Sequence, residues 1–161
     1  MALSTVLEPH EKGEIFEQYV RKRLFDYNHY ELLDRAPRYT ADREQFALSA
    51  LRPDFKFRER KTGLVFLVEA KYRTLYDKNN LIRWSYRAQR ERYLAYNREY
   101  PTFLLIGLGR HPERPDLLGL LPITQANYNC LFLKHIKQFK TPVDQPIPPK
   151  ELWIRGKLPP L

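Results

Sequence analysis

The sequence predicts a mixed α/β fold, in which a central sheet carries helices on its faces. Three observations lead to this fold class. Residues 53–60 and 64–72 have the patterns of two paired strands and are separated by a Lys-Thr-Gly turn. Residues 103–108 form a further apolar run of strand length. Segments with helical periodicity come before and after the hairpin, so helices and strands are mixed along one chain.

The first part of the chain predicts one helix followed by a short strand. Apolar residues recur every three or four positions over residues 11–27, which indicates an amphipathic helix that ends near Asn28. Residues 30–33 can form a short strand. Residues 37–50 are open to two interpretations, a short helix or a loop.

The hairpin is the clearest element of the chain. Phenylalanines alternate with polar residues over 53–60, which predicts a strand with one buried face. Residues 64–72 are an almost unbroken apolar run that ends in Glu69-Ala70-Lys71. This second pattern predicts a central strand that is buried on both faces.

The second part of the chain predicts a helix, two strands and a last helix. Residues 81–100 are rich in arginine and tyrosine and have the pattern of a long helix. Residues 103–108 and 117–123 follow as strands, and Thr124 is a good cap for a helix over residues 125–139.

Proline dominates the C-terminal tail. Six prolines lie in residues 141–161. Because proline fixes φ and lacks a backbone donor, a regular helix or a central strand is not expected there. The sequence therefore predicts one domain over residues 1–140 and a Pro-rich extended arm over residues 141–161. The arm either packs on the domain or contacts another chain.

Composition favours a polyanionic partner and excludes several kinds of site. The 161 residues include 28 Lys and Arg against 19 Asp and Glu, a net charge of +9, together with 11 Tyr, 9 Phe and 2 Trp. Such a basic, aromatic-rich chain suits a nucleic acid. The single cysteine, Cys130, excludes an intrachain disulfide and a cysteine-based zinc site. No phosphate-binding loop of the GxxxxGK type is present, so no nucleotide cofactor is expected.

The sequence also lacks a candidate membrane segment. No stretch approaches the roughly 20 apolar residues of a membrane span, and the N-terminal residues lack an apolar signal core. We therefore expect a cytoplasmic protein without membrane contact.

Three charged residues of the hairpin are candidates for a catalytic site. Glu69 and Lys71 are two positions apart on one strand, so their side chains share a face. Asp54 lies eight residues before Thr62 of the turn, and Glu69 lies seven residues after it. Such positions are near neighbours in an antiparallel ladder. We therefore expect two carboxylates and one ammonium group to converge at one edge of the sheet.

Such a group has the chemistry of a metal-dependent phosphodiesterase. Two close carboxylates repel each other, and a hard divalent cation relieves that repulsion. Lys71 beside the cation can orient the attacking water and stabilise charge in the transition state. The alternative is an ordinary strand that becomes polar where it reaches solvent, which is the better interpretation of Glu69 and Lys71 taken alone.

Two further motifs flank the hairpin in sequence, namely Gly13-x-x-Phe16-Glu17 and Gln89-x-x-x-Tyr93. Together with the Pro-Asp and Glu-Ala-Lys motifs of the hairpin, they resemble the PD-(D/E)xK nuclease superfamily, also called restriction-endonuclease-like. The resemblance covers about residues 13–108. It implies a restriction-endonuclease-like mixed central sheet flanked by helices, with an αβββαβ core.

The resemblance also implies roles for individual residues. In that family the Asp and the Glu bind magnesium or manganese, and the Lys assists the nucleophilic water. The matching residues here are Asp54, Glu69 and Lys71. The carbonyl of the middle residue, here Ala70, often also ligates the metal. A Glu on the first helix commonly joins the site. The match is Glu17, with Glu14 one turn away as the alternative.

The Gln89 and Tyr93 pair resembles an element of the RecB-like branch of the superfamily, which includes exonucleases. There the element lies on the helix after the catalytic Lys and helps to hold the substrate or the active site. Residues four apart share one helical face. The alternative is an amphipathic helix that happens to contain both residue types.

Basic residues close to Lys71 in sequence are candidates for phosphate contact: Arg73, Arg87 and Arg90. Contacts of this kind position a nucleic acid without reading its sequence. The alternative is that these arginines solvate an exposed face.

The function expected from the sequence is a metal-dependent nuclease that hydrolyses phosphodiester bonds, foremost in DNA, with Mg²⁺ or Mn²⁺ as cofactor. Two alternatives stay open, a non-catalytic nucleic-acid-binding module on the same fold and an interaction subunit. Exonuclease, nicking, junction-resolving and site-specific endonuclease activities all occur on this scaffold. A homodimer would cut both strands of a duplex more easily.

Overall fold

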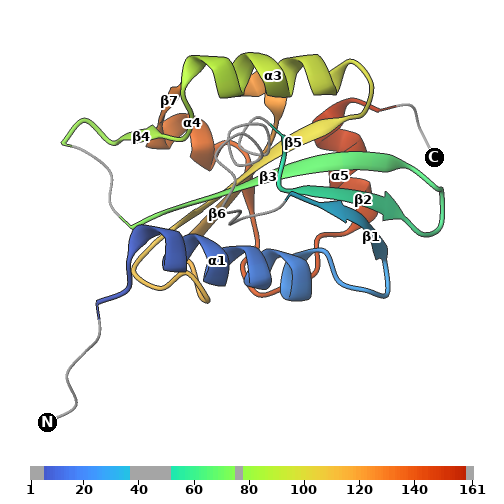
Figure 1. Cartoon of the computed structure of the whole chain (residues 1–161), viewed down its shortest axis with the longest axis horizontal. Coiled ribbons are helices and arrows are strands. Elements are labelled where there is room, and N and C mark those ends of the chain that lie inside the picture. Colours follow the sequence, from blue (N-terminus) through green and yellow to red (C-terminus); the bar gives the residue numbers. More distant parts are fainter. Residues whose placement is uncertain (1–5, 37–51, 75–77, 159–161) are drawn as a thin grey trace, which may run out of the picture.

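The computed structural model describes residues 6–36, 52–74 and 78–158, and it has a six-stranded mixed sheet at its centre (Figure 1). In chain order the strands are β1 (Tyr30–Arg35), β2 (Phe55–Glu59), β3 (Val65–Arg73), β5 (Thr102–Leu108), β6 (Leu117–Pro122) and β8 (Lys140–Thr141). They lie side by side in the order β1-β2-β3-β5-β6-β8. β3 and β5 are parallel, and all other neighbours are antiparallel.

Helices cover both faces of this sheet. They are α1 (Pro9–Tyr19) with its π-helical continuation η1 (Val20–Leu24), α3 (Arg87–Asn97), the 3₁₀ turn η2 (Ile123–Gln125), α4 (Leu133–Lys137) and α5 (Pro149–Gly156). α1 and α3 lie on opposite faces of the sheet (Figure 1). The order α1, β1 to β3, α3 and β5 confirms the expected αβββαβ core. Residues 37–50, which the sequence leaves as a short helix or a loop, lie outside the described residues.

The β2–β3 hairpin forms as its pattern predicts. Phe55 and Phe57 are buried on one face of β2, while the residues between them are more accessible. The turn closes at Gly63, whose φ of 77° favours glycine, and the buried Glu59 carboxylate accepts hydrogen bonds from the amides of Lys61 and Thr62.

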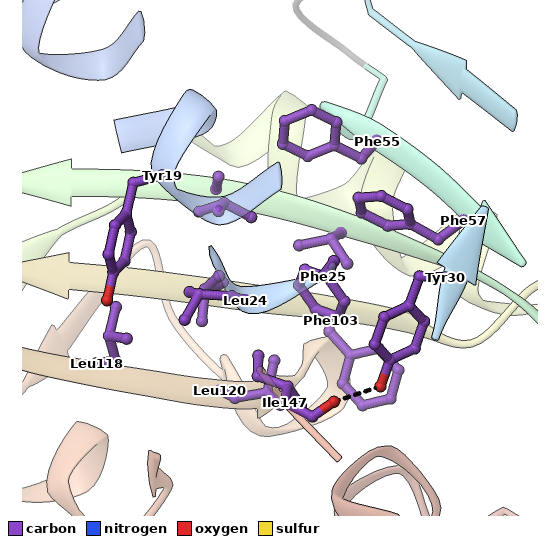
Figure 2. Close-up of a cluster of buried hydrophobic side chains, with 14 of the residues drawn as sticks. Tyr19, Leu24, Phe25, Tyr30, Phe55, Phe57, Phe103, Leu118, Leu120 and Ile147 are labelled. Carbon is purple, nitrogen blue, oxygen red and sulfur yellow. Dashed lines mark hydrogen bonds between the residues drawn. The ribbon is translucent and has the colours of Figure 1, made fainter. Parts of the chain in front are cut away.

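Aromatic side chains fill the core between the sheet and α1. The ring centroids of Phe25 and Phe57 are 4.9 Å apart, and those of Phe25 and Tyr30 are 5.2 Å apart. Figure 2 shows this cluster and the Tyr30 hydroxyl, which donates a 2.6 Å hydrogen bond to the carbonyl of Ile147. The C-terminal segment therefore packs on the same core as the first helix.

β5 is buried along its whole length, as the apolar run predicts. Gly107 of β5 is required by the packing of α1 on the sheet. A Cβ added at Gly107 would lie 2.4 Å from Cε2 of Phe16, so α1 can approach the sheet only because this position lacks a side chain.

The long helix expected over residues 81–100 is wrong at its N-terminal end. Residues Leu81–Arg83 form the short strand β4, and α3 begins only at Arg87. β4 pairs with β7 (Cys130–Phe132) in a separate two-stranded sheet, and the amide of Trp84 donates to the carbonyl of Asn129. Backbone pairing with a distant segment therefore overrides the local preference for a helix.

The same pairing overturns the helix expected over residues 125–139. β7 lies in the middle of that range, and only Leu133–Lys137 are α-helical. Leu131 and Ile136 are buried against the α3 face of the sheet. Cys130, which lies inside the range expected to be helical, is half-buried on β7.

The tail is not the extended arm that its prolines predict, because α5 forms over Pro149–Gly156. Pro149 occupies the first turn, where its missing N–H removes no intrahelical hydrogen bond. Leu152 is fully buried, and the guanidinium of Arg155 donates to the carbonyls of Leu120, Phe139 and Lys140. These contacts fix α5 against β6 and β8.

Among the described residues, no helix has the length and apolarity needed to cross a lipid bilayer.

Candidate active site

The antiparallel register of β2 and β3 brings Asp54 and Glu69 together. Phe55 pairs with Val68. When this antiparallel register is continued by one position, Asp54, just before β2, lies opposite Glu69 of β3. The Asp54 amide donates to Oε2 of Glu69 at 3.1 Å, and the Ala70 amide donates to Oδ2 of Asp54 at 2.9 Å. The two carboxylates are therefore neighbours across the ladder, as the count from the turn predicts. They meet where β2 begins and beside the middle of β3, within the sheet and not at the edge that the sequence predicts.

Lys71 lies on the same face of β3 as Glu69 and pairs with it. Its Nζ is 3.1 Å from Oε1 of Glu69, and the side chains are 19% and 3% exposed, respectively. Burial lowers the pKa of Lys71, but the charges of Glu69 and Asp54 outweigh this effect and raise the pKa above its ordinary value. The ammonium group is therefore held in its charged form beside two carboxylates.

Glu17 reaches this group from α1. Its side chain is 8% exposed, and its Oε2 lies 3.3 Å from Nη2 of Arg35. Burial and then the charge of Glu69 raise the pKa of Glu17, Arg35 and Lys71 lower it, and the net result is a pKa of about 7. Glu17 is thus close enough to the hairpin residues for their charges to act on it.

Asp54 completes a cluster of three carboxylates. Burial raises its pKa well above the ordinary value, and the charges of Glu69 and then Glu17 add to the rise. Lys71 and the hydrogen bond from the Ala70 amide act in the opposite direction. Asp54 as a residue is only half-buried, but its carboxyl group is surrounded by protein atoms, which is why burial dominates.

The donor set of this cluster fits a hard divalent cation. Carboxylate oxygens are the ligands that magnesium prefers, and a cation would relieve the repulsion that raises these pKa values. Within the described ranges, no group of three or more His, Cys, Asp or Glu residues is arranged around a common metal position. In the metal-free chain these carboxylates have other partners: Lys71 and the Asp54 amide hold the Glu69 carboxylate, and Arg35 holds Glu17.

Gln89 and Tyr93 face the sheet from α3. They are 6% and 0% exposed. The Tyr93 ring stacks on Trp84, with centroids 6.2 Å apart. The Tyr93 hydroxyl lies near Glu69, whose charge raises the tyrosine pKa after the larger effect of burial. It makes no hydrogen bond of ordinary geometry in the part of the chain that the structure describes. Tyr93 therefore borders the carboxylate cluster, one helical turn from the buried Gln89.

The three arginines expected to contact phosphate differ in their surroundings. Arg73 donates to the carbonyls of Tyr72 and Arg83, and Arg90 donates to the carbonyl of Ala126 at 2.7 Å. Both therefore hold the backbone together. Arg87, at the start of α3, has an 87% exposed side chain and pairs with Glu91. Phosphate contact by these residues stays a prediction, and Arg87 is the most accessible of the three.

Arg35 is a member of the cluster that the sequence did not indicate. It is the last residue of β1, and the pairing of β1 with β2 places it opposite Phe55, one position from Asp54. Its Nη2 bonds Glu17, while its Nε is buried without a hydrogen-bond partner among the described residues. No local motif marks this position, since only the strand pairing brings it to the site.

Comparison with known proteins gives a structural likeness only. No protein-family model matches the sequence, and no curated protein matches it. Six chains of solved structures match. One of them is Hjc, a Holliday junction resolvase from the archaeal hyperthermophile Archaeoglobus fulgidus, at 11% sequence identity and a TM-score of 0.46. The match covers 68% of this chain and 80% of that chain. A likeness of this degree transfers neither residues nor activity.

Proposed function

We propose that this chain is a divalent-metal-dependent nuclease that hydrolyses phosphodiester bonds in DNA. One observation carries the proposal. Asp54, Glu69 and Lys71 converge at one end of the β2–β3 hairpin, and the charge of Glu69 also acts on Glu17 from α1. Catalytic sites are where burial and like charges commonly shift pKa values, so this buried group of three mutually repelling carboxylates is a candidate for catalysis.

The carboxylates supply the metal ligands in this proposal. Asp54 and Glu69 would hold Mg²⁺ or Mn²⁺, with Glu17 and the Ala70 carbonyl as further ligands. When bound, the ion would supply a lowered pKa for its water and would neutralise charge on the phosphate. Arg35 holds Glu17 by a 3.3 Å contact, so it fixes the direction in which this carboxylate faces the cluster.

Lys71 acts on the substrate side. Its ammonium group can donate hydrogen bonds to the attacking water and to a non-bridging phosphate oxygen. Attack of the water oxygen on phosphorus and departure of the sugar oxygen would place more negative charge on the phosphate oxygens. A fixed ammonium group stabilises that charge in the transition state. Gln89 and Tyr93 support the cluster from α3, where both side chains are buried.

DNA is the substrate proposed because the chain carries a net charge of +9, which suits a polyanion. Arg87 is the most exposed of the candidate phosphate contacts. Phosphate contacts supply most of the affinity of a nuclease for a DNA backbone and weaken with added salt.

The test is cleavage by the purified chain across a panel of labelled substrates. Single-stranded, duplex, flapped and four-way DNA, and RNA, are incubated with Mg²⁺, with Mn²⁺ or with EDTA. We expect metal-dependent DNA cleavage that Asp54→Ala and Lys71→Ala both abolish. Lys61→Ala is the matched control, because Lys61 is an exposed lysine at the opposite end of the same hairpin. Cleavage that survives both site substitutions would overturn the mechanism.

A non-catalytic nucleic-acid-binding module is the second candidate. Both carboxylate oxygens of Glu69 already have a partner, Lys71 for one and the Asp54 amide for the other. This favours the second candidate, because a metal ion would have to compete with these contacts. Binding of DNA without cleavage in either metal would support this second function over the first.

A further inference from the structure

A pocket of about 250 Å³ lies beside the candidate active site. It is formed between the start of β2 and the C-terminal end of α3. The charged residues and tyrosines that line it are Asp34, Arg52, Lys56, Tyr96, Glu99 and Tyr100. Asp54 and Glu69 do not line it, so the pocket is separate from the carboxylate cluster.

The pocket lies one step along the strands from the cluster. Lys56 follows Asp54 by two positions on β2, Leu67 precedes Glu69 by two positions on β3, and Lys56 pairs with Leu67. Residues two apart on a strand share a face and are about 6.6 Å apart. A base that enters the pocket packs on the side chains that line it, so it is unstacked from at least one neighbour in its strand.

The charges of the pocket suit a neutral ligand. Two carboxylates, Asp34 and Glu99, are balanced by Arg52 and Lys56. Arg52 already pairs with Asp34 at 3.3 Å. A phosphate needs a net positive surrounding, which this pocket does not offer. A heterocycle with donors and acceptors on its edge does fit, because carboxylates accept hydrogen bonds from exocyclic amino groups.

Two tyrosines give the pocket aromatic surfaces. Nζ of Lys56 lies 4.4 Å from the ring centroid of Tyr100, and the guanidinium of Arg92 lies 5.2 Å from that of Tyr96. In each case the cation takes one face of the ring. A base that stacks on the other face would gain from both the ring and its cation.

We propose that this pocket binds one unstacked nucleobase of DNA, from the nucleotide next to the phosphate that is cut. The proposal rests on the proposed nuclease function and narrows its substrate class. The substrates it selects carry an unpaired nucleotide at the cut, as DNA ends, flaps and junctions do. Fully paired duplex leaves the pocket without a ligand.

The test measures binding in EDTA, so that cleavage plays no part. Fluorescence anisotropy compares three labelled DNAs: a duplex with one unpaired 2-aminopurine nucleotide, the same duplex with an abasic nucleotide there, and a fully paired duplex. We expect the duplex with the unpaired base to bind most tightly. Tyr100→Ala should weaken that binding roughly five- to a hundredfold, as loss of one stacked base does, and should leave the abasic duplex unchanged. The 2-aminopurine fluorescence should fall on binding and recover in this variant.

Two further variants make the result specific. Tyr100→Phe keeps the ring and should keep the affinity. Tyr27→Ala is the matched control, because Tyr27 is 81% exposed and also carries an arginine over its ring, with Arg60 at 4.3 Å, but does not line the pocket. If circular dichroism shows that Tyr100→Ala is unfolded, Tyr96→Ala carries the same expectation.

The pocket assignment fails if the abasic and base-containing duplexes bind equally to the native chain, or if the tyrosine variants weaken both equally. Failure of the nuclease function looks different. In that case no DNA of the panel is cut with metal, while the base-dependent binding in EDTA persists. If both hold, cleavage maps to the phosphate beside the unpaired base.

Discussion

Replacing Glu17 with glutamine should stabilise the metal-free chain. Burial, with help from the charge of Glu69, raises the pKa of Glu17 from 4.5 to about 7. Each pKa unit corresponds to about 1.4 kcal/mol. Ionising Glu17 in the folded chain therefore costs about 3 kcal/mol more than in the unfolded chain, and the neutral amide in Glu17→Gln avoids that cost.

The effect has a defined pH dependence. Because the folded-state pKa is raised, the folded chain binds more protons between pH 4.5 and about 7, and the stability of the native chain falls as pH rises through that window. The native chain and Glu17→Gln should have the same unfolding free energy below pH 4.5. They should diverge up to about pH 7, and differ by about 3 kcal/mol above it. For a chain of this length the variant should melt roughly 6 to 12 °C higher at pH 8.

The assay is urea unfolding in EDTA, followed by circular dichroism at several pH values. Glu14→Gln is the matched control, because Glu14 lies on the same helix but is not among the groups whose charge acts on Glu17 or Asp54. Excess Mg²⁺ should stabilise the native chain more than the variant and narrow the gap. Equal stability of the native chain and Glu17→Gln at pH 8, or a gap that shrinks as pH rises, would refute the reasoning.

Three other substitutions test separate parts of the structure. Arg35→Gln removes a cation that lowers the pKa of Glu17, so the pH range over which the unfolding free energy falls should extend to higher pH in the same urea experiments. An unchanged pH range would contradict the contact between Arg35 and Glu17. Tyr93→Phe removes a buried hydroxyl that has no partner of ordinary geometry among the described residues, so urea unfolding should show equal or greater stability. A loss of more than about 1 kcal/mol would mean that this hydroxyl does have a partner. Gly107→Ala should destabilise by about 1 to 3 kcal/mol, because its Cβ would meet Phe16 at 2.4 Å; an unchanged urea midpoint would argue against that packing.

The hairpin and the strand next to it could be predicted because their patterns are local. Alternation fixed the buried face of β2, the Lys-Thr-Gly turn fixed the register, and the register alone places Asp54 opposite Glu69. β5 was predictable for a related reason, because a strand buried on both faces is apolar throughout.

The errors fall where distant contacts decide the structure. Leu81 and Cys130 lie in segments that were expected to be helical, but these segments pair with each other as β4 and β7. Neither segment has a sequence pattern from which its partner strand could be predicted. α5 forms in the Pro-rich tail because four of the six prolines come before it or within its first turn and the other two follow it, and the rest of the helix packs on β6. Arg35 could not be predicted as a member of the cluster for the same reason as β4, because the residues that it contacts are remote from it in sequence.

The hydrogen bonds that join Tyr19 of α1 and Tyr30 of β1 to the C-terminal segment also bear on how the chain folds as it is synthesised. The Asp144 amide donates to the Tyr19 hydroxyl, and the Tyr30 hydroxyl donates to the Ile147 carbonyl, across 125 and 117 residues of sequence. At the usual rate of translation, the later partner leaves the ribosome on the order of ten seconds after the earlier one. During that interval the aromatic face of the first helix lacks part of its cover. The nascent chain therefore has a period in which chaperone binding or aggregation competes with closure of the core, and that period ends only when residue 147 emerges.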